Sequence, residues 1–276
     1  MRWTPGGDRG NLEDRRGMGG LGKGLGIGGT VIVLALSLLT GRNLFQDLGV
    51  EPGVGGAAAP MTAADSARQE QQVDFVVDVL NDAQTTWQTI FSQNGQQFRP
   101  AKLVLFRNST QSGCGIGQSA MGPFYCPADQ KVYIDLAFYD DLSSRFGAKG
   151  DFAQAYVLAH ELGHHVQHLS GTDAQVRSRQ ESNPDAANEL SVRLELQADC
   201  YAGVWSHSAQ TRNKLEPGDV DEALGAASAV GDDRIQQQTT GHVNVDAFTH
   251  GSAAQRAEWF KRGMESGDPR SCNTFQ

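Results

Sequence analysis

The stretch VLAHELGHHVQHL, from Val157 to Leu169, contains four of the seven histidines in this 276-residue chain. Its first part, His160-Glu161-Leu162-Gly163-His164, has the pattern HExxH. On an α-helix, residues four positions apart are separated by about 40° around the axis, so the two imidazoles share one face. Histidine is a common zinc ligand, and the intervening glutamate can take a proton from a metal-bound water. The stretch predicts a helix with two zinc ligands, His160 and His164, and Glu161 as general base.

The alternative is a helix whose histidines are solvated or paired in a core. The surrounding residues disfavour it, because most are apolar and polar groups in such surroundings need a strong reason: Tyr156, Val157, Ala159, Leu162, Gly163 and Val166. A metzincin would continue the motif with glycine at 167 and histidine at 170, but the chain has Gln167 and Ser170. His165 is rotated by about 100° from His164, away from the metal. His168 lies one turn further on, and we expect neither to be a ligand.

A third ligand is expected downstream, because a catalytic zinc ion has three protein ligands and one water. The segment LELQADCYAG contains Glu195 and, four residues later, Asp199. On a helix these two carboxylates share a face. Glu195 is the candidate third ligand, and Asp199 is the candidate partner of a ligand histidine's outer nitrogen. A charged, solvated helix face is the alternative, which the mostly apolar flanks of both residues disfavour.

These residues carry a family resemblance. HExxH followed by ExxxD resembles the gluzincin metallopeptidases. A closer resemblance, to the neutral zinc metallopeptidase family of bacterial single-pass membrane proteins, extends over the glycine-rich N-terminus and over GPFYCPADQKVYIDL, AHELGHHVQ, ELQADCYAGVW and FTHGSAAQRAEWF. It implies a zincin-like fold, Zn²⁺ as cofactor and a zinc-dependent endopeptidase that acts on a peptide or protein.

The tetrahedral intermediate of such a reaction needs an oxyanion donor besides the metal. His250, in the loop FTHGS before a predicted helix, is the candidate, although a capping or surface role is equally compatible with its position. Tyr201 and Tyr156 are lesser candidates, since tyrosines in such apolar surroundings more often belong to the core. Two other functions stay open: a metal-binding structural or inhibitory module without turnover, and a zinc amidase acting on cell-wall peptides. The intact Glu161 disfavours the first, since a site without turnover needs no base.

The N-terminal region differs in composition from the rest. Residues 1–23 are glycine-rich, with five basic and three acidic residues, and are expected to be a disordered cytoplasmic segment. Residues 24–41 carry no charge and are expected to form a transmembrane anchor, although a cleaved signal peptide is an alternative. Residues 42–65 are expected to be a flexible linker. The excess of basic residues before the anchor predicts a cytoplasmic N-terminus and an exported domain, periplasmic or extracellular.

Two further features agree with an exported enzyme. The formal net charge of -9 argues against a nucleic-acid partner. The four cysteines, an even number, favour two disulfides in an exported domain. A local bridge between Cys114 and Cys126 would leave Cys200 and Cys272 as the second pair; a four-cysteine zinc site is disfavoured because no CxxC pair exists.

Residues 66–276 are expected to form one metallopeptidase domain of the α+β class, dominated by helices and containing a small sheet. Hydrophobic periodicity predicts its elements: helices over residues 71–91, 151–169, 183–208, about 219–238 and about 252–265, with strands over 101–106 and 131–136. Residues 131–136 are a candidate edge strand for binding an extended substrate.

Overall fold

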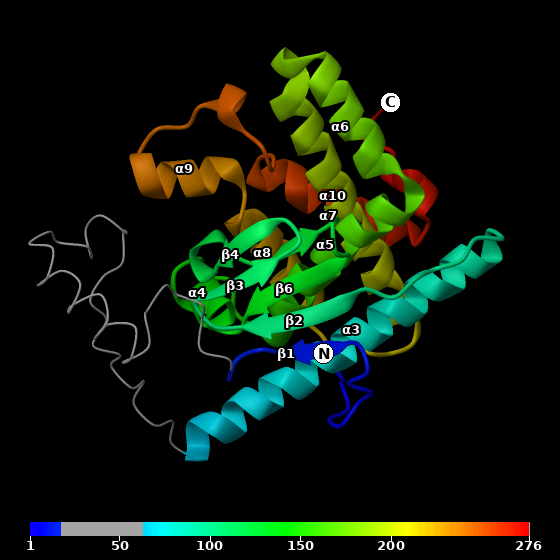
Figure 1. The fold of residues 1–276 in the computed structure, drawn as a ribbon, viewed down its shortest axis with the longest axis vertical. Helices are drawn as coiled ribbons and strands as arrows, with labels where there is room; N and C mark the ends of the chain where they lie inside the picture. The colour runs from blue at the N-terminus through cyan, green and yellow to red at the C-terminus, as the bar shows by residue number, and fades with distance from the viewer. Residues whose placement is uncertain (18–62, 276) are drawn as a thin grey trace, which may run out of the picture.

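The computed structural model describes residues 1–17 and 63–275, and its central sheet has the strand order β1-β2-β6-β5 (Figure 1). The two predicted strands, β2 and β6, lie side by side and run parallel, and all but the first residue of each is buried. Burial on both faces explains their continuous apolar sequences. The strands are β1 (Leu12–Asp14), β2 (Lys102–Phe106), β3 (Ser109–Ser112), β4 (Gly115–Gln118), β5 (Phe124–Cys126) and β6 (Lys131–Asp135), with β3 and β4 forming a separate hairpin.

Helices make up most of the described residues, which confirms the helix-dominated α+β class. Helix α3 begins eight residues before the helix predicted over 71–91, and three others match their predicted helices closely: α5, α7 and α10. The last begins with a capping box in which Ser252 and Gln255 bond each other's backbone N–H groups. The bounds are α3 (Ala63–Gln93), α4 (Ala137–Ser144), α5 (Asp151–Ser170), α6 (Thr172–Ser182), α7 (Ala187–Thr211), α8 (Asp219–Ala229), α9 (Asp232–Thr240) and α10 (Ala253–Ser266).

Helix α5 is the centre of the domain and contacts α3, α7 and α8 as well as strands β5 and β6. Near its start, the ring of Phe152 stacks on Trp205 of α7, with 5.6 Å between ring centroids. The indole N–H of Trp205 donates to Asp82 of α3 at 2.9 Å. Both rings are buried, and aromatic side chains of this size contribute much of a core's stabilisation. These contacts hold α5 in a fixed position between α3 and α7.

The N-terminal segment is part of the folded domain, so the prediction of disorder over residues 1–23 is wrong for residues 1–17. Strand β1 pairs in parallel with β2, with Leu12 opposite Leu103. The ring of Trp3 packs edge-on against Phe75 of α3, and Arg9 donates to Asp74 on the same helix at 2.7 Å. The charged composition suggested solvation, but several of these charges have partners on the domain.

The predicted anchor, residues 24–41, lies outside the described residues, as does most of the predicted linker, residues 42–65. The last three linker residues belong to α3 instead. Within residues 1–17 and 63–275, every helix is too short or too polar to cross a bilayer. Because β1 and β2 are hydrogen-bonded neighbours, residues 1–17 share a compartment with the domain whenever the sheet is complete.

Glu13 of β1 provides a test of this docking. Its carboxylate accepts from Lys131 at 2.8 Å and from Arg15 at 2.8 Å, and these bonds outweigh partial burial and lower its pKa to about 2. A carboxyl with a lowered folded-state pKa stabilises the fold above its ordinary pKa, and this contribution is lost as the pH falls. Glu13→Gln should therefore lower the free energy of unfolding by up to about 1 kcal/mol at pH 7, as for partly exposed ion pairs.

The difference between Glu13→Gln and wild type should shrink as the pH falls from about 4.5 towards about 2. Urea unfolding at a series of pH values measures it, with the exposed Glu181→Gln as the control. A difference that does not change with pH would contradict the docked position of Glu13.

Both expected disulfides are present, Cys114–Cys126 and Cys200–Cys272, which confirms this pairing. The first ties the turn of the β3–β4 hairpin to strand β5. The second ties α7 to the C-terminal 3-10 turn Pro269–Cys272. Each disulfide therefore has one cysteine on an element that borders the candidate site described below, β5 for the first and α7 for the second.

Two predictions about the elements around the site are wrong. The helix expected over 219–238 is two helices, α8 and α9, because the chain turns at Val230 and Gly231. A Cβ atom at Gly231 would lie 2.3 Å from the backbone nitrogen of Ala253, so only glycine fits where this turn meets α10. Strand β6 is not an edge strand, since it lies between β2 and β5. The edge on that side is β5.

Candidate metal centre and active site

Helices α5 and α7 bring the three predicted ligands to one point. The Nε2 atom of His160 lies 3.1 Å from one carboxylate oxygen of Glu195, and the Nε2 atom of His164 lies 3.4 Å from the other. The candidate ligand atoms of the three residues all lie within 4.8 Å of one another. The expected convergence of the two helices is therefore present.

Gly163, inside the HExxH motif, allows this convergence. A Cβ atom at this position would lie 2.9 Å from the carbonyl oxygen of Ala198 and 3.0 Å from its Cα. Glycine therefore lets α5 approach the backbone of α7 three residues after Glu195. The close approach brings the carboxylate within reach of both histidines.

Both histidines have partners that fix which ring nitrogen is free. The Nδ1 atom of His160 lies 2.8 Å from a carboxylate oxygen of Asp199, and the Nδ1 atom of His164 lies 2.9 Å from Oε1 of Gln167. A carboxylate or amide oxygen only accepts, so each imidazole donates from Nδ1. When these imidazoles are neutral, each Nε2 atom, the one that faces Glu195, has the lone pair that a metal ion can take. Asp199 thus lies where the sequence predicts.

Gln167 was missed as a functional residue, although it stands in the motif region. Its amide nitrogen donates to the carbonyl oxygen of Leu194 at 2.6 Å and to Gln197 at 3.1 Å, which fixes the orientation of the amide. One side chain thereby links His164 on α5 to the backbone next to Glu195 on α7. The HExxH and ExxxD motifs give no signal for this role.

The electrostatics of the buried site favour a bound cation. Burial alone would raise the pKa of Glu195, but the neighbouring His164 and His160 hold it well below its ordinary value. Burial likewise opposes ionisation of Asp199, and Arg256 and His160 lower its pKa. Glu195 therefore stays ionised as a candidate ligand, and Asp199 stays ionised beside the histidine that it orients. A site with these two negative charges suits a divalent cation.

Glu161 supplies the observation that best tests the fit of a metal. Its side chain is buried, and its Oε2 atom has no hydrogen-bond partner in the part of the chain that the structure describes. An unsatisfied buried carboxylate oxygen is costly unless a ligand or water completes it. The donor set fits a catalytic zinc ion with its water. His160, His164 and Glu195 would be the ligands, and the free oxygen of Glu161 would bond the water.

The site opens into a cleft of about 710 Å³. One wall is formed by Tyr125 and its neighbours on the edge strand β5, and helices α4, α6 and α9 contribute further residues. The cleft reaches His160, Glu161, His164 and Glu195 as well as His250. It is large enough for several side chains of an extended peptide.

His250 lines the cleft from the loop before α10, and Ser252 rather than His250 caps that helix. Its Nδ1 atom lies 3.1 Å from Asp232, the first residue of α9. Asp232 also accepts from the backbone N–H groups of His250, at 2.6 Å, and of Thr249, at 2.7 Å. The loop and the ring are therefore held by one carboxylate, which sequence reasoning did not identify.

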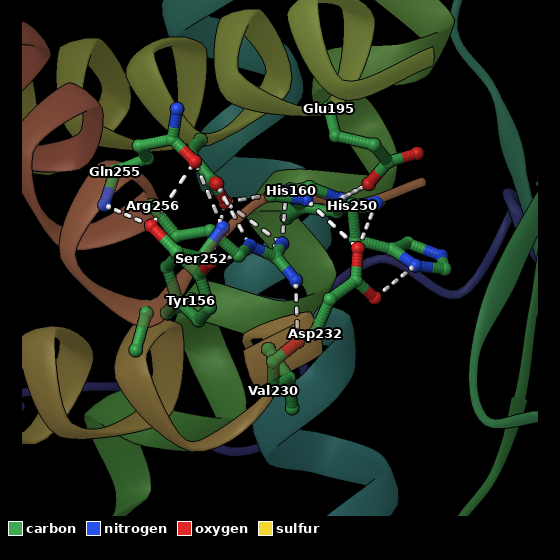
Figure 2. Close-up of polar contacts among 12 residues, drawn as sticks. Tyr156, His160, Glu195, Val230, Asp232, His250, Ser252, Gln255 and Arg256 are labelled. Carbon is green, nitrogen blue, oxygen red and sulfur yellow. Dashed lines mark hydrogen bonds and ion pairs between the residues drawn. The ribbon is translucent and has the colours of Figure 1, made fainter. Parts of the chain in front are cut away.

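Arg256 of α10, labelled in Figure 2, is another residue that the sequence did not reveal. Its buried side chain donates to Asp199 at 2.9 Å and to the hydroxyl of Tyr156 at 3.3 Å. Its only sequence signal is its position in FTHGSAAQRAEWF, six residues after His250. Tyr156, a lesser candidate for the oxyanion donor, hydrogen-bonds Asp199 through its hydroxyl.

The other two histidines of the opening stretch lie outside the ligand set, as expected. The Nε2 atom of His165 lies 2.6 Å from the carbonyl oxygen of Arg99, and its Nδ1 atom lies 3.0 Å from the hydroxyl of Tyr125. Burial lowers the pKa of His165 to about 4, so this imidazole is neutral and structural. His168 bonds Asp173 at 2.9 Å.

The comparison with known families agrees with this geometry. A family model described as "Putative neutral zinc metallopeptidase" matches residues 1–275. The chain belongs to this family. The match confirms the resemblance carried by the motifs, and it includes the N-terminal segment that docks on the sheet.

Relatives of similar length support the assignment to the family. YpfJ of Escherichia coli K12 is 49% identical over 283 residues, which cover 100% of this chain and 99% of that protein. Rv2575 of Mycobacterium tuberculosis H37Rv is 50% identical over 184 residues, which cover 63% of this chain and 61% of that protein. No solved structure matches the chain.

Gln167 gives a prediction about the metal centre. In Gln167→Leu, the Nδ1–H group of His164 loses its acceptor and α5 loses a bond to α7. We expect zinc affinity to fall by about 10–100-fold, the usual effect of removing a group that orients a metal ligand. Competition with a chelator measures the affinity. An affinity within twofold of wild type would show that Gln167 does not orient His164.

Proposed function

We propose that the protein is a zinc-dependent endopeptidase with a zincin-like active site, in which His160, His164 and Glu195 hold Zn²⁺ and Glu161 is the general base. One observation carries the proposal: three ligand atoms converge beside a buried glutamate oxygen that has no partner among residues 1–17 and 63–275. A site without turnover has no need of such a carboxylate at this position, which disfavours the structural module.

When bound, zinc lowers the pKa of its water to about 7 and polarises a carbonyl group. Glu161 accepts a proton as the water attacks the scissile carbonyl, and then delivers it to the nitrogen of the leaving amine. Asp199 and Gln167 keep the two imidazoles oriented while charge develops. The burial of Glu161 limits competing solvation, so its interaction with the attacking water is strengthened.

His250 is proposed to donate to the developing oxyanion. Its hydrogen bond to Asp232 raises the pKa of His250 above its ordinary value of 6.5, against the effect of burial. The raised pKa favours the imidazolium, whose Nε2–H can donate while Nδ1–H stays on Asp232. Activity should then decline on the alkaline side as His250 loses its proton, and His250→Ala should remove this decline.

An extended peptide is the proposed substrate, bound along strand β5. This strand is at the end of the sheet order, pairs antiparallel with β6, and carries Phe124 and Tyr125 into the cleft wall. An exposed strand edge can add a peptide as a further strand through main-chain hydrogen bonds, which need no particular side chain.

The test uses the purified full-length protein with an unfolded protein and a peptide library as substrates. Cleavage that a chelator stops and added zinc restores is expected, with products that show internal cleavage sites. Cleavage of cell-wall peptides alone would replace the endopeptidase proposal with the amidase. No cleavage of any amide by zinc-loaded protein would overturn both.

We further propose that residues 24–41 attach the protein to a membrane and that the disulfide-bonded domain is exported. The two disulfides support an oxidising compartment. The pairing of β1 with β2 supports a location of residues 1–17 beside the domain. If residues 24–41 crossed the membrane once and left the N-terminus in the cytoplasm, β1 and the exported domain would lie on opposite sides of the membrane. Strand β1 would then have to leave the sheet.

Cysteine labelling in intact cells separates these arrangements, because all four native cysteines are in disulfides. Pro5→Cys and Gln96→Cys each add one exposed thiol, in the N-terminal segment and in the domain. Labelling of both by a membrane-impermeant reagent is expected. Labelling of Gln96→Cys alone would establish a single crossing with β1 detached, and labelling of neither would contradict export.

A further inference from the structure

Arg256 is a buried cation whose hydrogen bonds go to two separate parts of the site. Its residue is only 4% exposed. The Nε atom donates to one oxygen of Asp199 at 2.9 Å, and Nη2 donates to the other at 3.0 Å. A buried guanidinium is costly unless it is paired and its N–H groups are satisfied. The bidentate hydrogen bonds to Asp199 pair the charge of Arg256 and fix the plane of the carboxylate.

The carboxylate that Arg256 fixes is the one that orients a metal ligand. Asp199 is fully buried, and its Oδ1 atom lies 2.8 Å from Nδ1 of His160. The hydroxyl of Tyr156 bonds the same oxygen, and Nη2 of Arg256 reaches that hydroxyl at 3.3 Å. Rotation of the Asp199 carboxylate would therefore break bonds to Arg256, Tyr156 and His160 together.

The other end of the guanidinium holds the turn between α8 and α9. Its Nη1 atom donates to the carbonyl oxygen of Val230 at 3.2 Å. Two residues later Asp232 holds the loop of His250 through its side chain, as Figure 2 shows. The neighbouring Gly231 packs against the backbone of Ala253, so this turn lies directly on the start of α10.

We infer that Arg256 is a positioning residue that aligns the Asp199–His160 pair with the turn that holds His250. It joins the metal centre on α5 and α7 to the turn that holds the proposed oxyanion donor through one planar guanidinium group. The inference rests on the proposed peptidase function for His250, but its effect on His160 is independent of turnover.

Arg256→Lys is the informative variant, because it keeps the buried charge but replaces the planar fork with a single ammonium group. Lysine cannot hold both oxygens of Asp199 and the Val230 carbonyl in the same geometry. We expect kcat to fall by about 10–100-fold with little change in KM, and zinc affinity to fall by up to about 10-fold, within the range seen when partners of metal ligands are removed. Arg262→Lys, an exposed change on the same helix, is the control and should leave both unchanged.

A double-mutant cycle tests the connection to His250. In the Arg256→Lys background, His250→Ala should cost clearly less activity than in wild type, because the imidazole is already displaced. If the two substitutions reduce activity by independent factors that multiply, the connection between Arg256 and His250 is overturned. If Arg256→Lys keeps the kcat and the zinc affinity of wild type, the inference itself is overturned. If the wild-type protein cleaves nothing, the proposed function fails, while chelator competition still tests whether Arg256 supports His160.

Circular dichroism and thermal unfolding of Arg256→Lys check that the variant is folded. If it unfolds, the milder Tyr156→Phe, which removes one of the groups bonded to Asp199, takes its place in the zinc-affinity comparison. An unchanged affinity in Tyr156→Phe would contradict a network that orients His160 through Asp199.

Discussion

Replacing Glu161 with glutamine should reduce peptide cleavage by about 10²–10⁴-fold, the usual contribution of a positioned general base. Glutamine has nearly the same shape but cannot accept a proton from the attacking water. The metal ligands His160, His164 and Glu195 are unchanged, so zinc content and zinc affinity should match wild type. Cleavage assays and metal analysis on the same preparation measure both quantities.

A matched control is Glu181→Gln, an exposed change on α6 that should affect neither activity nor metal. Glu161→Gln with more than a tenth of the wild-type activity would remove the general base from the mechanism. Loss of zinc in the same variant would indicate instead that Glu161 is a ligand.

Gly263→Ala should destabilise the domain by about 3 kcal/mol, at the upper end of the usual effect of overpacking a core. A Cβ atom at this position would lie 1.9 Å from the carbonyl oxygen of Cys200 on α7. The facing Gly203 would bring a Cβ atom to 2.1 Å from the carbonyl oxygen of Phe260 on α10. The two helices therefore meet backbone to backbone through a pair of glycines, and any side chain there forces them apart.

The better helix propensity of alanine, worth about 1 kcal/mol, cannot offset this clash. Gly225→Ala on α8 separates the two effects, because that glycine is exposed and its Cβ would meet no atom within 4 Å. It should be neutral or stabilising by up to about 1 kcal/mol. Urea unfolding measures both variants. If Gly263→Ala were as stable as wild type, α7 and α10 could not be packed this closely.

Separation of α7 from α10 should also weaken zinc binding, because Asp199 lies on α7 and Arg256 on α10. A lower zinc affinity in the folded variant would show that the site has changed, whereas an unchanged affinity would show a loss of stability alone. The affinity is measured by chelator competition below the unfolding temperature.

The sequence was most informative where a periodic pattern and a chemical motif coincide. The HExxH helix and the ExxxD helix were both found, and Glu195 and Asp199 lie where helical spacing places them. The strands β2 and β6 were found because their apolar runs are buried on both faces. The cysteine pairing was suggested by the short loop between Cys114 and Cys126, and the structure confirms it.

Other features have no local signal. The polar β1 strand is recognisable only through its partners, since charges such as Glu13 are neutralised by residues distant in the sequence. The break at Gly231 depends on its contact with α10, which helical periodicity does not report. Arg256 and Asp232 are ordinary charged residues in sequence, and their roles come from tertiary neighbours. The edge position of β5 likewise depends on the sheet order.

One metal ion held by His160, His164 and Glu195 is central to the proposed function. The most direct measurement is an anomalous difference map, recorded at the zinc absorption edge, from crystals of the purified protein. We predict a single strong peak about 2.0–2.1 Å from the Nε2 atoms of both histidines and next to the Glu195 carboxylate. A map without a peak there, in crystals grown with zinc, would contradict the proposed metal centre.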